Sequence, residues 1–164
     1  MKPALLVIDV QKEFFKAPVT VQSLNDAIEY INTAIGLFRS KSLPIVCIQH
    51  EDVESNLVPG TEGFGLPDNL DILSSDAHIV KTYGNGFNKT PLAGILREWG
   101  VDTVIITGYC AEYCVLSTCR GAMDLDFTPI LLRDALASGK PENIKFVEDV
   151  NDVISYKALA KALE

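Results

Sequence analysis

The sequence is poor in the features that mark several broad classes of protein. Its 14 Lys and Arg residues are outnumbered by 22 Asp and Glu residues, so the formal net charge of the 164-residue chain is −8. Nucleic-acid-binding proteins concentrate basic residues on one face, and no basic cluster is present here. We therefore expect no nucleic-acid partner, and a small molecule or a protein in its place.

Long apolar runs and paired cysteine motifs are also absent. The N-terminal apolar run, Ala4 to Ile8, stops at Asp9, which is too short for a signal-peptide core or a membrane span. We expect a cytoplasmic protein with no membrane association. In such a protein, cysteines without a CxxC spacing indicate free thiols, and neither disulfides nor structural zinc. The four are Cys47, Cys110, Cys114 and Cys119.

What is present is a regular alternation of strand-like and helix-like segments. Ala4 to Asp9 and Pro44 to Gln49 are continuous apolar runs typical of buried parallel strands. Between them, apolar residues recur every three or four positions from Leu24 to Phe38, which predicts an amphipathic helix capped by Thr20 or Ser23. Further strands are predicted at 78–81, 103–107, 128–132 and 153–155, and further helices at 91–99, 114–123, 141–150 and 157–163.

This alternation predicts a three-layer α/β/α fold with a mostly parallel, six-stranded, doubly wound sheet. The hydrophobic content of 48% is enough to bury one substantial core. No internal repeat, low-complexity tract or linker divides the chain. We therefore predict a single domain over residues 1–164.

Three polar residues fall at or just beyond the carboxyl ends of predicted strands, where open parallel sheets bind ligands: Asp9, Lys81 and Cys114. Cys114 is predicted near a helix N-terminus, where the local positive potential favours thiolate and can bind an oxyanion. An Asp with a raised pKa can accept the thiol proton, and a Lys can hold the anionic groups together.

Each of these residues also has an ordinary structural interpretation. An Asp at a strand end often forms a turn, a Lys there is usually solvated, and a buried Cys is often inert. The combination of all three favours a catalytic site. Aromatic side chains could form an apolar wall for its substrate, or could equally belong to the core: Phe14, Phe15, Phe64, Phe87, Tyr109 and Tyr113.

Three separated motifs stand out along the chain: Leu5 to Gln11 with Phe14, Val80-Lys81 followed by Phe87 and Thr90, and Gly108 with Cys114-Val115. Together they resemble those of the isochorismatase-like cysteine hydrolases, a family that includes nicotinamidases and N-carbamoylsarcosine amidohydrolases. The resemblance covers nearly the whole chain and implies a catalytic triad of Asp9 as general base, Lys81 as electrostatic partner and Cys114 as nucleophile.

The resemblance also implies details of the mechanism. A cis peptide is expected between Tyr109 and Cys110, with the backbone N–H groups of Cys110 and Cys114 forming an oxyanion hole. The implied reaction forms a thioester on Cys114, releases ammonia or an amine, and then hydrolyses the thioester without a cofactor. Relatives form dimers and larger assemblies, so a homo-oligomer is expected.

The substrate is the least determined part of this prediction. Nicotinamidases bind a divalent metal through an Asp-x-His set and a further His, whereas this chain has Gln49-His50-Glu51-Asp52 at the matching place. True isochorismatases lack the nucleophilic cysteine. We therefore expect a metal-independent hydrolase of small amide or carbamoyl compounds. The alternatives are a metal-assisted nicotinamidase that uses His50 and Asp52, and a non-catalytic binding or assembly module.

Overall fold

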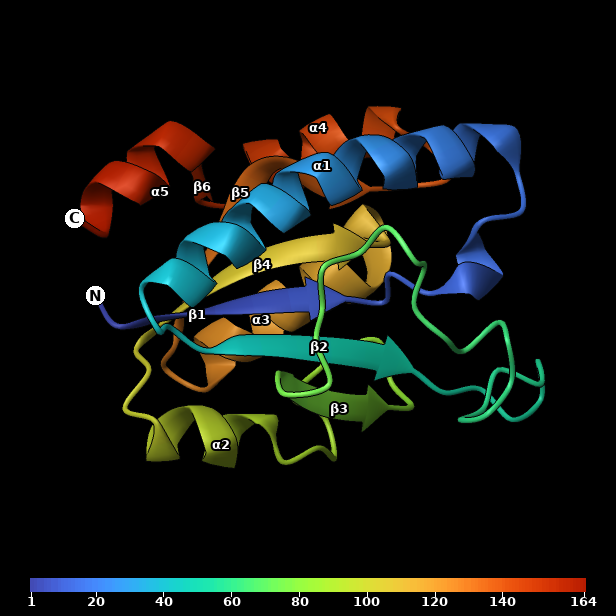
Figure 1. Cartoon of the computed structure of the whole chain (residues 1–164), viewed down its shortest axis with the longest axis horizontal. Coiled ribbons are helices and arrows are strands. Elements are labelled where there is room, and N and C mark those ends of the chain that lie inside the picture. The colour runs from blue at the N-terminus through green and yellow to red at the C-terminus, as the bar shows by residue number, and fades with distance from the viewer.

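The computed structural model describes residues 1–164 and contains one six-stranded sheet in which every pair of neighbours is parallel (Figure 1). The strand order is β3-β2-β1-β4-β5-β6, so the chain winds outward in both directions from β1. This confirms the predicted α/β fold. The strands are β1 (Pro3–Ile8), β2 (Ile45–His50), β3 (Ala77–Lys81), β4 (Thr103–Tyr109), β5 (Thr128–Ala137) and β6 (Val153–Ile154).

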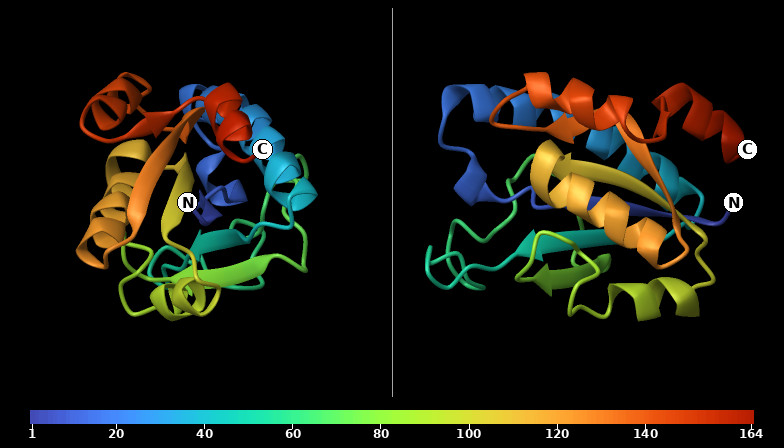
Figure 2. Two further views of the ribbon diagram at one scale, coloured as in Figure 1. Left: turned by 90° about the vertical axis from the view of Figure 1, so that its left-hand side faces the viewer. Right: turned by 180° about the vertical axis from the view of Figure 1, so that it is seen from behind.

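Helices cover both faces of the sheet because alternate residues of the central strands are buried on opposite sides (Figure 2). Leu5 and Val7 of β1 pack toward α1 and α5, whereas Leu6 and Ile8 pack toward α2, α3 and α4. No helix combines the length and apolar character needed to cross a membrane. The helices are α1 (Pro18–Ser40), α2 (Leu92–Glu98), α3 (Leu116–Asp124), α4 (Glu142–Asp149) and α5 (Tyr156–Ala162).

The start of α1 differs from the prediction. The helix begins at Pro18 and follows Ala17, with no side-chain cap, so the predicted caps at Thr20 and Ser23 are wrong. Proline fits the first turn because its fixed φ is already helical and its missing N–H would have no partner there. Ser23 instead accepts a hydrogen bond from the backbone N–H of Ser138, which ties α1 to the end of β5.

Strand β5 is longer than predicted and extends to Ala137. Its pairing with β4 is interrupted between Ile106 and Gly108, and Asp134 has a φ of 66°, which are the marks of a β-bulge. The polar residues Arg133 and Asp134 hide this extension from an analysis based on apolar runs. The extended strand carries the chain to Ser138, next to the site described below.

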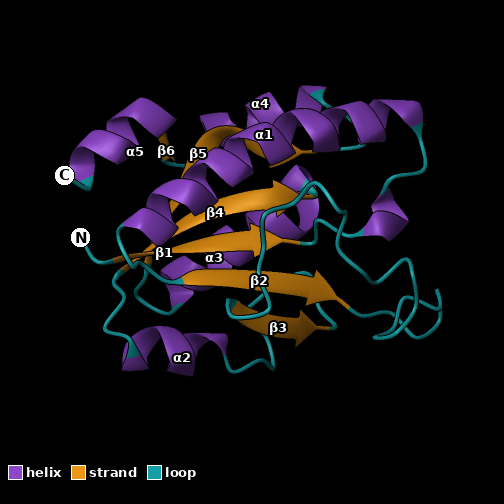
Figure 3. Cartoon of the chain, viewed as in Figure 1, coloured by secondary structure: helices purple, strands orange, loops and turns teal.

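Gly108 allows β1 and β4 to approach closely at their carboxyl ends. It has a φ of +113°, and a Cβ at this position would lie 2.1 Å from the carbonyl oxygen of Ile8. No other residue fits that space. The segment 51–76 is a loop that leaves the carboxyl end of β2 and returns across the sheet to the start of β3 (Figure 3), with one isolated bridge between Asp52 and Leu57.

Candidate active site

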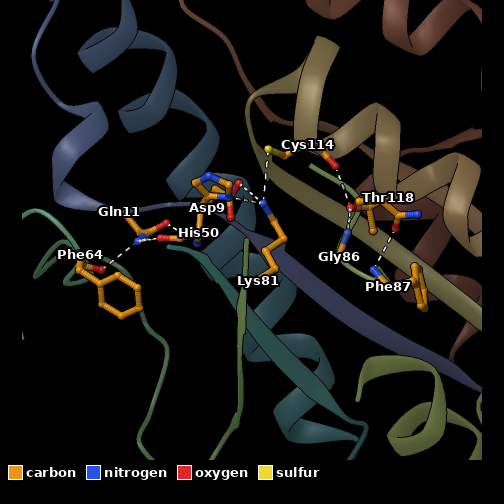
Figure 4. A network of polar contacts seen from close by, with 10 residues as sticks. Asp9, Gln11, His50, Phe64, Lys81, Gly86, Phe87, Cys114 and Thr118 are labelled. Carbon is orange, nitrogen blue, oxygen red and sulfur yellow. Dashed lines mark hydrogen bonds and ion pairs between the residues drawn. The ribbon is translucent and has the colours of Figure 1, made fainter. Parts of the chain in front are cut away.

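The site is organised around the ammonium group of Lys81, the last residue of β3 (Figure 4). Its Nζ lies 2.9 Å from Asp9 Oδ2, 3.4 Å from Cys114 Sγ and 3.1 Å from His50 Nδ1. The Lys81 side chain is fully buried, and that of Asp9 is 2% exposed. The structure therefore brings together all three residues predicted to act in catalysis, and it adds His50 to the group.

Asp9 follows β1 in a left-handed turn with a φ of 51°, and its backbone N–H donates to the carbonyl oxygen of Ile48. Its Oδ1 is the only buried side-chain oxygen or nitrogen without a hydrogen-bond partner. Burial raises the pKa of Asp9 above its usual value, and the charge of Lys81 opposes this only in part. The sequence analysis required an Asp with a raised pKa as acceptor of the thiol proton, and Asp9 has this property.

Cys114 lies in a π-helical turn, Ala111–Val115, that precedes α3. The Val115 N–H donates to the Cys110 carbonyl oxygen five residues earlier, at 3.2 Å, which widens this turn relative to an α-helix. The expected cis peptide between Tyr109 and Cys110 is present. Thr118 donates through Oγ1 to the Cys114 carbonyl oxygen at 2.7 Å, and accepts from the N–H of Gly86 at 3.0 Å.

The predicted thiolate at Cys114 is wrong for the resting protein. Burial, followed by the negative charge of Asp9, raises the pKa of Cys114 to about 12, although Lys81 acts to lower it. The positive end of a helix does not offset these effects, because Cys114 precedes α3 and faces a carboxylate. Cys114 is therefore held as a thiol beside the Asp9 carboxyl group.

Glu112 anchors the turn that contains Cys114 to the segment after β5 and to α4. Its carboxylate accepts hydrogen bonds from Ser138 Oγ at 2.8 Å, Asn143 Nδ2 at 3.0 Å and Cys110 Sγ at 3.1 Å. Burial acts to raise the pKa of Glu112, but the hydrogen bonds, that of Asn143 foremost, hold it below its usual value. Sequence analysis missed this cluster because its members lie on three separate segments.

A cavity of about 430 Å³ opens beside Cys114, a volume suited to a small molecule. Lys81 does not line the cavity, but its Nζ contacts three residues that do, namely Asp9, His50 and Cys114. A larger hollow of about 590 Å³ between α1 and α4 contains none of the three predicted catalytic residues. The cavity at Cys114 is lined by Asp9, Phe14, His50, Tyr109, Cys110, Glu112, Tyr113, Cys114, Gly139 and Lys140.

The aromatic residues predicted as a substrate wall divide into two groups. Phe14, Tyr109 and Tyr113 line the cavity, and the rings of Phe14 and Tyr109 lie 4.7 Å apart. The other three lie outside it, which corrects the prediction for them. Phe15 packs against the α1 side of the core, and Phe64 is a buried residue of the loop 51–76. Phe87 stacks on Phe127, at 5.7 Å.

The donors considered for a metal do not converge. Asp52 accepts hydrogen bonds from Ser55 Oγ at 2.5 Å and from the backbone of Glu54 at 3.0 Å, so its carboxylate closes a local turn. The Nδ1 atom of His50 contacts Lys81, which is a cation. No group of three His, Cys, Asp or Glu side chains is arranged to hold a metal ion. These residues do not fit the metal set expected of a nicotinamidase.

Gln11 ends the first sequence motif but was not predicted as a site residue. Its fully buried side chain holds the backbone of His50 in place. Its Oε1 accepts from the N–H of His50 at 2.8 Å, and its Nε2 donates to the carbonyl oxygens of His50 at 3.0 Å and Phe64 at 3.1 Å. Gln49 donates to the same Phe64 oxygen at 2.9 Å. The two amides tie the loop 51–76 to the sheet edge that carries the site.

The fold and the site define a parallel α/β protein with Asp9, Lys81 and Cys114 gathered at the carboxyl edge of its sheet. The sequence model of the Isochorismatase domain matches residues 3–147, and the chain therefore belongs to the isochorismatase family of hydrolases.

Individual relatives agree with this assignment. The "Uncharacterized isochorismatase family protein YrdC" of Bacillus subtilis is 32% identical over 139 residues, which cover 84% of this chain and 74% of that protein. An isochorismatase-like hydrolase from Alkaliphilus metalliredigens superposes with a TM-score of 0.90 at 27% identity and covers 100% of both chains. The N-carbamoylsarcosine amidase of Thermoplasma acidophilum gives a TM-score of 0.82 at 28% identity, with 94% and 96% covered.

Proposed function

We propose that the protein is a cysteine amidohydrolase that cleaves a small amide or carbamoyl C–N bond through a thioester on Cys114, without a metal. One observation carries the proposal: Lys81 Nζ contacts both Asp9 and Cys114, at 2.9 and 3.4 Å, beside a cavity sized for a small molecule. The likeness to an N-carbamoylsarcosine amidase supports the choice of bond.

In the first half of the reaction, Asp9 takes the proton from the Cys114 thiol as sulfur attacks the carbonyl carbon. Proton transfer at the moment of attack suits a thiol with a pKa near 12 and a carboxylate with a raised pKa, because neither partner holds a stable charge alone. The N–H groups of Cys110 and Cys114 stabilise the oxyanion. Protonated Asp9 then gives its proton to the leaving nitrogen, and ammonia or an amine departs.

In the second half, Asp9 removes a proton from water, and the resulting hydroxide attacks the thioester carbonyl. The C–S bond breaks, the proton returns from Asp9 to sulfur, and the acid leaves. Lys81 remains charged throughout and compensates the negative charge that passes between Asp9 and Cys114. Its full burial makes this interaction stronger than a surface ion pair would be.

An ammonia-release screen over small amides, carbamoyl compounds and ureides tests this function. We expect turnover of at least one compound, loss of that turnover in Cys114→Ala, and retention in the matched control Cys119→Ala, since Cys119 is buried in α3 away from the cavity. Activity should survive a chelator. Failure to release ammonia from any compound, or turnover unchanged in Cys114→Ala, would favour the non-catalytic binding module instead.

We further propose a reducing, cytoplasmic location and a homo-oligomeric assembly. All four cysteines are free thiols, and three of them are buried, which supports a compartment where disulfides do not form. Sedimentation equilibrium of the purified protein tests the assembly.

A further inference from the structure

His50 is placed where it can act on both the catalytic cation and the substrate. It ends β2, the strand between β1 and β3, and is the register partner of Lys81 across the β2–β3 ladder. Figure 4 shows its ring beside Asp9, with a contact to the Lys81 ammonium. The residue also lines the cavity at Cys114. Gln11 binds both backbone polar groups of His50, so its position does not depend on a mobile loop.

The contact with Lys81 determines which ring nitrogen carries the proton. An ammonium group has three N–H donors and no acceptor, so His50 Nδ1 must accept the hydrogen bond at 3.1 Å. Asp9 and Cys114 take the other two donors. A neutral imidazole that accepts at Nδ1 carries its proton on Nε2. Burial, with the charge of Lys81, lowers the pKa of His50 against the opposing charges of Asp9 and Asp52, which keeps the ring neutral.

The Nε2 atom has no partner in the protein. Nδ1 makes the only hydrogen bond of the ring, and Nε2 is not among the buried atoms left without a partner. The free Nε2–H therefore reaches the cavity that His50 lines. A fixed donor at the wall of a small cavity is the usual means by which a site orients a bound acceptor oxygen.

We propose that His50 is a positioning and substrate-binding residue, whose Nδ1 holds Lys81 while its Nε2–H binds a carbonyl or carboxylate oxygen of the substrate. The inference rests on the proposed function for its second half only. It implies that good substrates carry an acceptor oxygen within reach of Nε2. The first half concerns the tautomer, which is a property of the free protein.

The tautomer is tested by ¹⁵N NMR of histidine-labelled protein at pH 7. The chain has only two histidines, so a spectrum of His78→Gln assigns the signals of His50 directly. His78 is exposed and contacts the Leu73 carbonyl oxygen, away from the cavity. We expect His50 to be neutral with its proton on Nε2. A proton on Nδ1, or a doubly protonated ring, would overturn the inference.

Two variants separate the roles kinetically on the best compound from the ammonia screen. In His50→Asn the amide oxygen can replace Nδ1 toward Lys81, but nothing reaches the position of Nε2, so we expect KM to rise roughly tenfold with kcat retained. In His50→Gln the amide can replace Nε2, whereas the Lys81 contact is lost, so we expect kcat to fall more than KM rises. His78→Gln should leave both parameters unchanged.

The outcomes distinguish the two proposals. Equal losses in His50→Asn and His50→Gln, with no split between KM and kcat, would mean a purely structural role and overturn the inference. An Nε2–H tautomer in a protein that releases no ammonia would contradict the proposed function and support the first half of the inference. Ammonia release with a proton on Nδ1 would do the reverse.

Discussion

At the scale of single residues, the position of one proton decides how the site works. Asp9 and Cys114 both have raised pKa values for the same first cause, which is burial. The negative charge of Asp9 raises the pKa of Cys114 further, whereas Lys81 acts to lower both pKa values. The resting site therefore avoids two adjacent anions.

The first prediction concerns the ionisation of Cys114. Because its pKa is raised to about 12, the group stays a thiol at neutral pH and loses its proton only in strong alkali. Absorbance at 240 nm, measured as the difference between the protein and Cys114→Ala, should show no thiolate step below about pH 9. A step between pH 5 and 8 would contradict the geometry described here.

The second prediction concerns the buried pair of Asp9 and Lys81. Lys81→Met leaves the Asp9 carboxylate without its partner, and we expect the free energy of unfolding to fall by about 3–5 kcal/mol at pH 8. The double variant Asp9→Asn/Lys81→Met removes both charges and should regain most of that loss. Urea denaturation of the three proteins measures it, and an equal loss in the double variant would contradict the prediction.

The same variant has a definite pH dependence. In Lys81→Met the folded pKa of Asp9 remains raised, so the folded state binds the proton more tightly than the unfolded state. This contribution to stability is complete below the ordinary pKa of an Asp and is lost as the pH rises through the folded pKa. Lys81→Met should therefore be more stable at pH 5 than at pH 8, relative to the parent protein.

At the scale of secondary-structure elements, the third prediction tests the close approach of β1 and β4. In Gly108→Ala the new methyl group meets the Ile8 carbonyl oxygen and the positive φ is strained, so the strands must separate. We expect a large fall in melting temperature and in any activity. Gly36→Ala is the matched control: it lies in α1 with open space around it and should gain about 1 kcal/mol.

Individual elements also show what sequence alone could provide. Strands β1, β2 and β4 were predicted closely because both faces are buried and their apolar runs are continuous. The extension of β5 was missed because a bulge places Arg133 and Asp134 in the strand. Asp9, Lys81 and Cys114 could be found because polar, reactive residue types fall at or shortly after the ends of apolar runs.

The remaining features of the site had no local signal. His50 contacts Lys81 on the neighbouring strand, and Glu112 is bound by Ser138 and Asn143. The pKa of Cys114 is raised by burial and then by a carboxylate 105 residues earlier in the chain. Each depends on a distance that exists only after folding. Sequence analysis therefore found which groups were available but assigned the wrong charge to one of them.

At the scale of the whole molecule, the fourth prediction concerns cooperativity. If residues 1–164 form a single domain, unfolding is one transition by every probe. The chain has a single Trp, Trp99, which packs at the end of α2 on one side of the sheet, whereas far-UV circular dichroism reports on every helix. The two denaturation curves should superpose. A fluorescence transition that precedes the loss of helicity would indicate separate units.

Asp9, Lys81 and Cys114 come from the ends of β1 and β3 and from the turn after β4, and they meet only once the sheet is complete. A complete chain that has not yet folded has every chemical group of the site and no site. The site is thus assembled in the same step as the sheet, and a partly folded copy has the Cys114 thiol without Asp9 and Lys81 beside it.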